Sequence, residues 1–184
     1  MNDSSLIIKA GRQDRKAQTL LYEQYQRAWY MICLRYNKNT EDAQDSMQNG
    51  LIRIFSNIGL FDEKKGNFKS WSSKIMVNES LMYLRKKAST FRVDSIDDLN
   101  DISENQETPL DAMSAEELTK MIQRLPDGYR VVFNMYVIEG YTHQEIAETL
   151  QINEGTSKSQ LFKAKKMLQL QLESQLQQKA YVRQ

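Results

Sequence analysis

Residues 142–168 have the sequence THQEIAETLQINEGTSKSQLFKAKKML, and this stretch decides the fold of the C-terminal third of the chain. Thr142 is a residue type that caps helices, and Ile146 and the small Ala147 follow it at helical spacing. The short polar turn QIN comes next, and its last residue, Asn153, is a second capping residue type. Two short helices joined by a tight turn are predicted, which is the arrangement of a helix-turn-helix.

The second of these two helices has two distinct faces. At about 100° per residue, small and apolar side chains collect on one face, while polar side chains and one aromatic ring collect on the other. The inward set is Ser157, Leu161, Ala164 and Leu168, and the outward set is Thr156, Ser159, Phe162, Lys163 and Lys166. Lysines neutralise phosphates, and Thr, Ser and Phe can meet base edges and the thymine methyl group in the major groove. The pattern favours a DNA-recognition helix; a helical hairpin with a solvated lysine face is the alternative.

The rest of the sequence predicts more helices, because no segment shows the alternation of a half-buried strand. Three amphipathic helices are expected at about residues 17–37, 40–57 and 68–87, with Thr40 as the cap of the second. Two shorter helices are expected before the helix-turn-helix, one closed by Pro126 and one ended by Gly140. The sequence therefore predicts an all-α fold with two small helical domains.

Charge is distributed unevenly along the chain, although the net charge of the 184 residues is only +1. Residues 93–119 contain no Lys or Arg. Their nine acidic residues are Asp94, Asp97, Asp98, Asp101, Glu104, Glu107, Asp111, Glu116 and Glu117. A polar, acidic and weakly periodic stretch is typical of a flexible linker without a core of its own.

Composition excludes several classes of protein. No stretch reaches the roughly 18 consecutive apolar residues of a membrane span, and no signal peptide is apparent, so we expect a cytoplasmic protein. The single cysteine, Cys33, lies on the apolar stripe of a predicted helix, where a buried core residue is expected rather than a reactive thiol. With one histidine, His143, the chain lacks the ligand cluster of a zinc site, and no metal or cofactor is expected. His143 itself is expected to face solvent.

Both halves together resemble the extracytoplasmic-function (group IV) branch of the bacterial sigma-70 family of RNA polymerase sigma factors. The resemblance rests on three segments: DAQDSMQNGLIRIF at residues 42–55, FDEKKGNFKSWSSKIMVNESLMYLRKK at 61–87, and LPDGYRVVFNMYVIEGYTHQEIAETLQINEGTSKSQLFKAKKML at 125–168. It implies a sigma region 2 domain at residues 1–90, the acidic linker at 91–114, a sigma region 4 helix-turn-helix domain at 115–176, and a C-terminal tail at 177–184. It also implies a non-enzymatic protein that binds core RNA polymerase, directs it to a promoter and opens the minus-10 element.

The resemblance further implies partners and contact residues. The partners are promoter DNA, an anti-sigma factor, and the clamp helices and flap of core polymerase. The residues implied at the clamp helices are Asp42, Asp45, Gln48, Asn49 and Arg53. Asp42, Asp45, Gln48 and Asn49 also form a polar face opposite Met47, Leu51 and Ile54; a merely solvated surface is the alternative.

The minus-10 contacts implied by the resemblance lie in the loop before the third long helix and on that helix. An extruded base would be captured there, which costs a few kcal/mol that stacking and edge hydrogen bonds offset. The residues are Phe61, Lys64, Lys65, Asn67, Asn78, Arg85 and Lys86. Asn78 is equally compatible with a satisfied buried amide, and Trp71 is expected to belong to the core.

The minus-35 contacts implied by the resemblance coincide largely with the outward face derived above. They are Lys158, Ser159, Gln160, Phe162 and Lys163, with Arg130 reaching a phosphate from an earlier helix. Together with Thr156 and Lys166 of the outward face they make up the expected minus-35 site. Lysines in place of the family's frequent arginines favour point-charge contacts with phosphates.

Three positions depart from the family pattern: Asn49 replaces a usual Glu, Ser157 a usual Val, and Gln151 a usual Gly. Ser157 is expected to lose packing energy, about 1 kcal/mol, unless its hydroxyl bonds back to the helix. Two other functions stay open on the residues alone. A conventional regulator would bind a palindrome as a dimer, whereas an enzyme would use Asp42 and Asp45 as metal ligands without any His partner.

Overall fold

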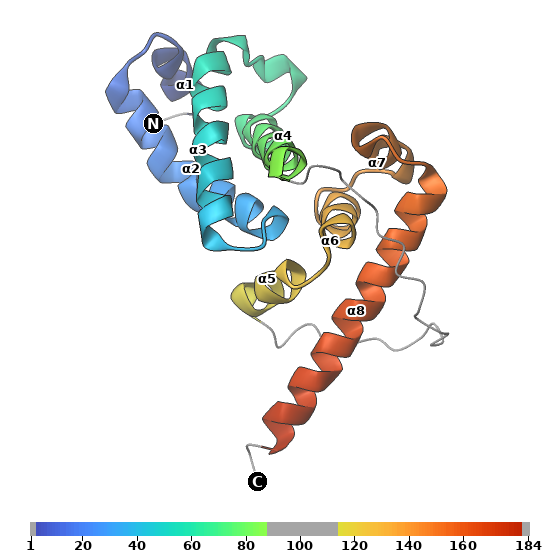
Figure 1. The fold of residues 1–184 in the computed structure, drawn as a ribbon. Helices are drawn as coiled ribbons and strands as arrows, with labels where there is room; N and C mark the ends of the chain where they lie inside the picture. The colour runs from blue at the N-terminus through green and yellow to red at the C-terminus, as the bar shows by residue number, and fades with distance from the viewer. Residues whose placement is uncertain (1–2, 88–113, 182–184) are drawn as a thin grey trace. The chain divides into compact units, whose positions relative to one another are not determined.

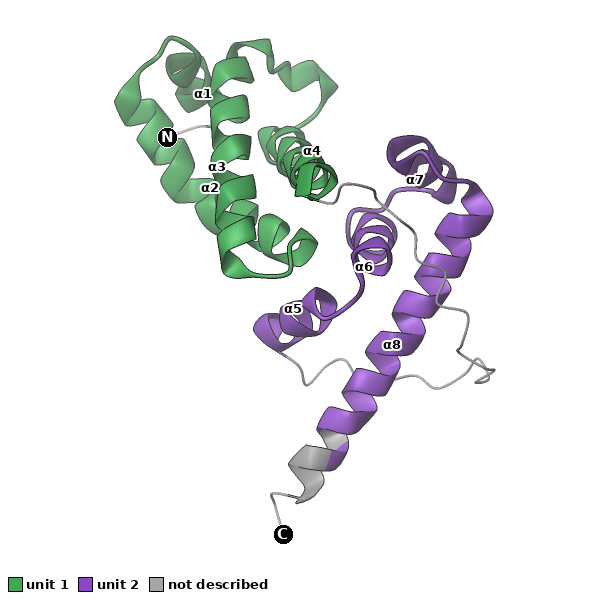
Figure 2. Ribbon diagram, viewed as in Figure 1, with its two compact units in different colours: residues 1–90 green, residues 91–184 purple. Residues whose placement is uncertain are grey.

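The computed structural model describes residues 3–87 and 114–181, and every regular element within them is helical. The chain divides into two compact units, Met1–Thr90 and Phe91–Gln184 (Figure 2). The prediction of an all-α fold with two small helical domains is confirmed. The acidic linker expected at residues 91–114 lies, apart from Ser114, outside the described residues.

The first unit is built from four α-helices that the chain visits in order (Figure 1). They are α1 (Asp3–Gly11), α2 (Arg15–Tyr36), α3 (Thr40–Asn57) and α4 (Phe68–Lys87), with the short 3-10 helices η1 (Ile58–Leu60) and η2 (Glu63–Lys65) between the last two. The three long helices match the predicted ones. Helix α1 was not predicted, because its buried residues Leu6, Ile7 and Ala10 fall within less than two turns and define no periodic stripe.

Polar caps fix where the helices of the first unit begin and end. Helix α2 starts where the Asp14 carboxylate accepts from the backbone N–H of Lys16 at 2.9 Å. Helix α3 starts where the Asn39 side chain accepts from the backbone N–H of Asp42 at 2.8 Å. The prediction of Thr40 as this cap is therefore wrong by one residue: Asn39 provides the capping oxygen, and Thr40 is the first helical residue.

The core of the first unit is rich in aromatic rings. Tyr25, Trp29, Phe61, Phe68 and Trp71 form a chain of rings whose neighbouring centroids are 5.4 to 5.6 Å apart. Such edge and offset contacts add to the hydrophobic burial. Cys33 is fully buried, and burial raises its pKa to about 11. The prediction of a buried core cysteine is confirmed.

The second unit contains the predicted helix-turn-helix. Its elements are α5 (Ala115–Gln123), α6 (Asp127–Phe133), the π-helical segment η4 (Asn134–Ile138), α7 (His143–Leu150) and α8 (Glu154–Tyr181). Thr142 caps α7 in a reciprocal capping box with Glu145, and the Asn153 side chain accepts from the backbone N–H of Thr156 at 2.6 Å at the start of α8. Both predicted caps are confirmed.

Helix α8 is longer than expected. It continues past Leu168 to Tyr181, into the residues expected to form the tail, because nothing after Leu168 breaks a helix. Its buried face includes Leu161, Ala164 and Leu172, and it packs on α6 and α7.

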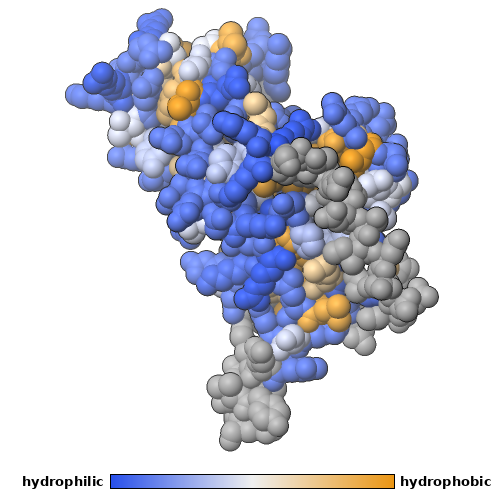
Figure 3. Space-filling model, viewed as in Figure 1, coloured by the Kyte–Doolittle hydropathy of each residue, from blue (hydrophilic) through white to orange (hydrophobic). Residues whose placement is uncertain are grey.

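On the face shown in Figure 3, hydrophilic side chains predominate and apolar ones form scattered patches.

Candidate functional site

The polar face expected on α3 is present for three of its four residues. Asp45, Gln48 and Asn49 are exposed, while Met47 and Ile54 on the other side of the helix are buried. The fourth residue, Asp42, is buried. The open part of this face therefore lies within a single turn of the helix, from Asp45 to Asn49.

Asp42 is occupied by groups of its own unit. Its side chain is only 12% exposed, and both carboxylate oxygens accept from the Lys87 ammonium at 2.7 Å. The Tyr83 hydroxyl donates to the same carboxylate at 2.9 Å. Although burial raises the pKa of Asp42, the hydrogen bonds from Lys87 and Tyr83 outweigh it and hold that pKa below its ordinary value. Asp42 is thus an internal ionic contact between α3 and α4 in this structure.

Arg53, the remaining residue expected at the clamp helices, is exposed and also reaches α4. Its Nε donates to the Glu79 carboxylate at 3.0 Å. The Arg53 side chain is 53% exposed, whereas that of Glu79 is only 12% exposed. Arg53 can therefore reach a partner, but it would have to leave or share the mostly buried Glu79 carboxylate.

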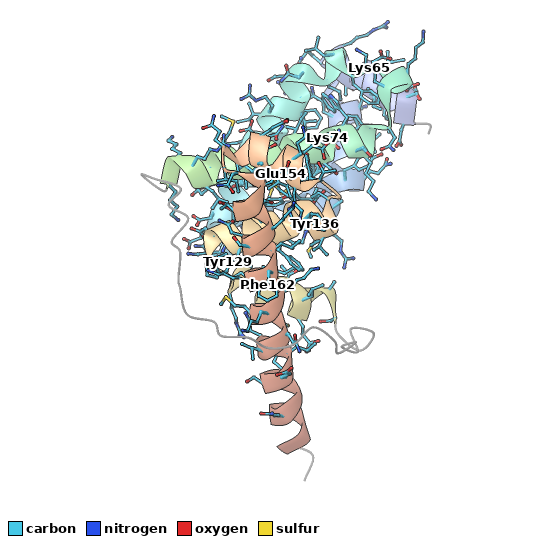
Figure 4. All side chains as sticks on the ribbon, turned by 90° about the vertical axis from the view of Figure 1, so that its right-hand side faces the viewer. Lys65, Lys74, Tyr129, Tyr136, Glu154 and Phe162 are labelled. Carbon is cyan, nitrogen blue, oxygen red and sulfur yellow. The ribbon has the colours of Figure 1, made fainter. Side chains whose placement is uncertain are left out.

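The loop between α3 and α4 carries the residues expected to capture an extruded base. Lys64 and Lys65 are exposed on η2, whereas Phe61 is half-buried against Phe68 and Trp71 (Figure 4 labels Lys65). Asn67 is exposed, and its side-chain oxygen accepts from the backbone N–H of Ser70 at 2.8 Å at the start of α4. The oxygen of the Asn67 side chain is thus used to cap α4, whereas its NH₂ group takes no part in that contact.

On α4, Asn78, Arg85 and Lys86 are all exposed. The alternative of a satisfied buried amide at Asn78 is therefore wrong. Trp71 is half-buried within the aromatic cluster, so its expected place in the core is confirmed only in part. Its ring contacts that of Phe61, in the loop that carries the two lysines, with centroids 5.6 Å apart.

The recognition helix α8 presents much of the outward face that the sequence predicts. Phe162 is 51% exposed and lies on α8 (Figure 4), and Ser159 and Lys158 are exposed nearby. Lys158 makes only a 3.6 Å ion pair with Glu154, one turn earlier. Thr156 and Lys163 are half-buried. An exposed ring between polar groups is an arrangement that can meet base edges in a major groove.

Three residues expected at the minus-35 element lie elsewhere than on the open surface. Gln160 is 3% exposed and lies against Gly128, where a Cβ atom would approach the Gln160 amide oxygen at 3.1 Å. Lys166 is 9% exposed, and Arg130 is fully buried. The Arg130 guanidinium donates to the Leu125 carbonyl at 2.7 Å and to the Asp127 carboxylate at 2.5 Å. The placement of Lys166 on an open outward face is therefore wrong.

The sequence interpretation missed a polar contact inside the helix-turn-helix. His143, expected to face solvent, is half-buried; its Nδ1 lies 2.8 Å from the hydroxyl of the fully buried Ser157. The imidazole also stacks on Tyr136, with centroids 4.4 Å apart. Burial and the charges of Lys158 and Lys165 lower the pKa of His143 below its ordinary value. The sequence offered one clue to this contact: the chain has a single histidine, His143, and has Ser157 on the core face, where the family usually has Val.

Comparisons with known proteins match both units. The family model described as Sigma-70 region 2 matches residues 21–90, and the one described as Sigma-70, region 4 matches residues 115–168. The ECF RNA polymerase sigma factor SigW of Bacillus subtilis (strain 168) is 30% identical over 176 residues, which are 90% of this chain and 92% of that protein. The chain belongs to the sigma-70 family. Its branch is the extracytoplasmic-function one.

Other relatives support the same assignment of this sigma factor. An ECF RNA polymerase sigma-E factor of Haemophilus influenzae is 26% identical over 182 residues, covering 92% of this chain and 94% of the relative. The sigma factor RpoE of Bartonella quintana, solved in complex with the anti-sigma factor NepR, has a TM-score of 0.52 at 19% identity. That likeness covers 84% of this chain and 96% of the solved one and shows a shared fold.

The family assignment decides between the functions left open by the residues. This protein is an alternative sigma factor, which binds core RNA polymerase and directs transcription initiation to particular promoters. A dimeric regulator is not supported. Across residues 3–87 and 114–181, no helix is long and apolar enough to cross a membrane.

Proposed function

We propose that this sigma factor binds core polymerase through the exposed turn of α3 and holds promoter DNA with both of its units. The observation that carries the proposal is that one chain presents both surfaces: the polar residues Asp45, Gln48 and Asn49 in the first unit, and the exposed Phe162 of a helix-turn-helix in the second. A DNA-binding regulator has no need of the first surface. A sigma factor needs both.

For the minus-10 element, we assign base capture to the loop before α4 and to the exposed amide of Asn78. Phe61 and the exposed part of Trp71 offer a ring surface for stacking, at the end of the loop that carries Lys64 and Lys65. The NH₂ group of Asn67 and the amide of Asn78 offer edge hydrogen bonds. Arg85 and Lys86, exposed near the end of α4, supply positive charge for phosphates.

For the minus-35 element, we assign base contacts to Phe162 and Ser159 and phosphate contacts to Lys158 and Lys163, with Thr156 near the start of the helix. Arg130 receives no phosphate contact in this proposal, because its guanidinium is buried and donates to Leu125 and Asp127. Gln160 and Lys166 are buried as well. Each would have to leave its present surroundings to touch DNA.

The proposed partners are core polymerase, promoter DNA and an anti-sigma factor. The last is included because a sigma factor of the same fold has been solved with such a protein bound. We propose further that the protein acts in the cytoplasm and catalyses no reaction itself. In that role the chemistry of RNA synthesis belongs to the polymerase.

Run-off transcription tests the proposal. Core polymerase is combined with the purified protein on a library of promoter fragments, and transcripts are sequenced to map their starts. We expect protein-dependent starts at a shared pair of elements. A protein that never associates with core polymerase, yet shifts a palindromic duplex by itself, would contradict the proposal.

Two substitutions on α8 divide its contacts into two kinds. Lys163→Ala should weaken binding to all promoters by a similar factor and reduce the dependence of binding on salt. Phe162→Ala should instead change the preferred minus-35 sequence. Lys165→Ala, at an exposed lysine of the same helix outside the assigned set, is the matched control.

A further inference from the structure

Tyr83 lies between two carboxylates of α3 that differ in burial. Its hydroxyl is 2.9 Å from a carboxylate oxygen of Asp42 and 3.2 Å from one of Asp45. Asp42 is buried, whereas Asp45 is exposed. Lys87 completes the cluster, with its ammonium on Asp42 and 6.0 Å from the centroid of the Tyr83 ring. No function assigned above uses Tyr83 or Lys87.

The hydroxyl of Tyr83 remains a donor throughout the ordinary pH range. The hydrogen bond with Asp42, together with burial, raises the pKa of Tyr83 to about 12. A phenol carries one proton and can donate to one carboxylate at a time. Asp42 already accepts from Lys87 with both oxygens and from the Asn39 amide at 3.2 Å. Asp42 therefore does not depend on the tyrosine proton alone, although its contact with the hydroxyl is the shorter one, and the hydroxyl can also donate to Asp45 at 3.2 Å.

We propose that Tyr83 is a positioning residue for polymerase binding, which holds the exposed Asp45 carboxylate in the orientation that a basic group of the polymerase requires. Lys87 acts with it, because its ammonium bonds both oxygens of Asp42 and so allows the tyrosine proton to be shared with Asp45. This inference rests on the proposed function, in which α3 binds core polymerase. An exposed aspartate without such a contact would lose rotamer freedom on binding, and prior orientation removes that cost.

The charge of the partner group follows from the same geometry. One oxygen of Asp45 lies against the Tyr83 hydroxyl, while the residue as a whole is exposed. A carboxylate accepts hydrogen bonds and binds cations, so the complementary group on the polymerase is an arginine or lysine side chain. Asp45 and the exposed amides of Gln48 and Asn49 then share one docking surface.

A double-mutant cycle on the full chain tests the proposal. The affinity of N-terminally labelled protein for core polymerase is titrated for Tyr83→Phe, Asp45→Asn and the double variant. We expect Asp45→Asn to weaken binding about tenfold and Tyr83→Phe about three- to fivefold, as for the loss of one charged contact or one hydrogen bond. In the Asp45→Asn background, Tyr83→Phe should have no further effect.

Controls separate positioning from simple stability. Both tryptophans, Trp29 and Trp71, lie in the first unit, so tryptophan fluorescence shows whether a variant is folded at the assay temperature. Tyr22→Phe, at an exposed tyrosine of α2, should leave the affinity unchanged. Lys87→Met provides a second variant: Asp42 then draws the tyrosine proton, and the affinity should fall in the wild-type background but not beside Asp45→Asn.

Each outcome bears on one claim. If Asp45→Asn weakens binding while Tyr83→Phe and Lys87→Met do not, positioning by Tyr83 is overturned and the α3 docking surface stands. Equal losses from Tyr83→Phe with and without Asp45 also overturn positioning, since the tyrosine then acts by another route. If Asp45→Asn has no effect, the proposed docking surface fails, and the positioning role fails with it.

Discussion

In the first unit, α3 and α4 are joined by charged groups, whereas in the second unit α7 and α8 are joined by an imidazole and a hydroxyl. Lys87 bonds Asp42 at 2.7 Å and Arg53 bonds Glu79 at 3.0 Å. In the helix-turn-helix, His143 lies 2.8 Å from the hydroxyl of Ser157. Both pairs of helices are expected to contact promoter DNA or polymerase. The ionic contacts of the first pair and the imidazole–hydroxyl contact of the second should nevertheless respond differently to substitution and to pH.

The difference follows from where the polar groups lie. The Lys87–Asp42 contact involves the last residue of α4, whereas the ring contacts of Phe68 and Trp71 lie in its first turn, so losing the ionic contact leaves the aromatic cluster in place. Ser157 is fully buried in the small core of the second unit, on the same face of α8 as the buried Leu161 and Ala164, about one and two turns further on. A buried hydroxyl that loses its partner keeps the full cost of desolvation. We therefore expect the second unit to be the more sensitive to changes in its polar link.

The largest effect is expected from steric change in the first unit. A Cβ atom on Gly50 of α3 would lie 2.3 Å from the sulfur of Met76 on α4, and Met76 is fully buried. Gly50→Val should destabilise the first unit by about 2–3 kcal/mol, because overpacking forces the helices apart. Urea unfolding followed by tryptophan fluorescence measures it.

Gly59→Val is the matched control, since a Cβ there meets nothing within 4 Å. It should change stability by less than about 0.5 kcal/mol. If both variants lose the same amount, close packing at the crossing of α3 and α4 is not what the first unit depends on.

The next effect concerns the link in the second unit. His143→Ala should cost about 1–2 kcal/mol, because the buried Ser157 hydroxyl loses its partner. Adding Ser157→Ala should recover part of that loss, since removing both partners is less costly than removing one. Circular dichroism reports the helices of both units and tryptophan fluorescence the first unit alone, so a change seen only by circular dichroism comes from the second unit, which contains no tryptophan. A double variant that is less stable than His143→Ala would show that the bond contributes little.

How much of this structure can be predicted from the sequence depends on how far apart along the chain the interacting groups lie. Helices and caps depend on neighbours within a few residues, so the three long helices and the caps Thr142 and Asn153 were predictable. The partners of Asp42 are 41 and 45 residues away in the chain. Periodicity gives the polar side of a helix, but it does not show which distant group covers that side.

The recognition helix shows the same limit on a smaller scale. Its helical pattern correctly exposes Phe162 and buries Leu161. Gln160 is buried because Gly128, on another helix, has no side chain to exclude it. Arg130 was expected on DNA from the family resemblance, yet its local partners Leu125 and Asp127 hold it inside.

A change of pH should separate the two units with a smaller effect. The pKa of His143 is below 6.5 in the folded protein, so the unfolded chain binds the proton more readily. The stability that this group contributes to the second unit is complete above about pH 6.5 and is lost as the pH falls through that value toward the folded pKa. Asp42 has a folded pKa below 3.8, so its contribution to the first unit persists until the pH falls below about 4.

Stability measured between pH 7.5 and pH 5 tests this separation. The second unit should be less stable at pH 5, so unfolding followed by circular dichroism should begin under milder conditions. Unfolding followed by tryptophan fluorescence should keep its midpoint, because the Asp42 contact persists over this pH range. Because His143 is the single histidine of the chain, its imidazole resonances can be titrated directly by NMR. An imidazole that titrates at or above pH 6.5 in the folded protein would contradict the expected direction.

The smallest effect should appear equally in both units. Among residues 3–87 and 114–181, each unit has one non-glycine residue at positive φ, Gln13 at 66° before α2 and Gln151 at 57° after α7. This region costs a side chain roughly 1 kcal/mol, and glycine adopts it without that strain. Gln151→Gly should therefore stabilise the second unit, and Gln13→Gly the first, by about 0.5–1 kcal/mol each, less than the strain because glycine also gains freedom in the unfolded chain. A gain in one unit alone would mean that the glutamine of the other makes contacts worth as much as its backbone strain.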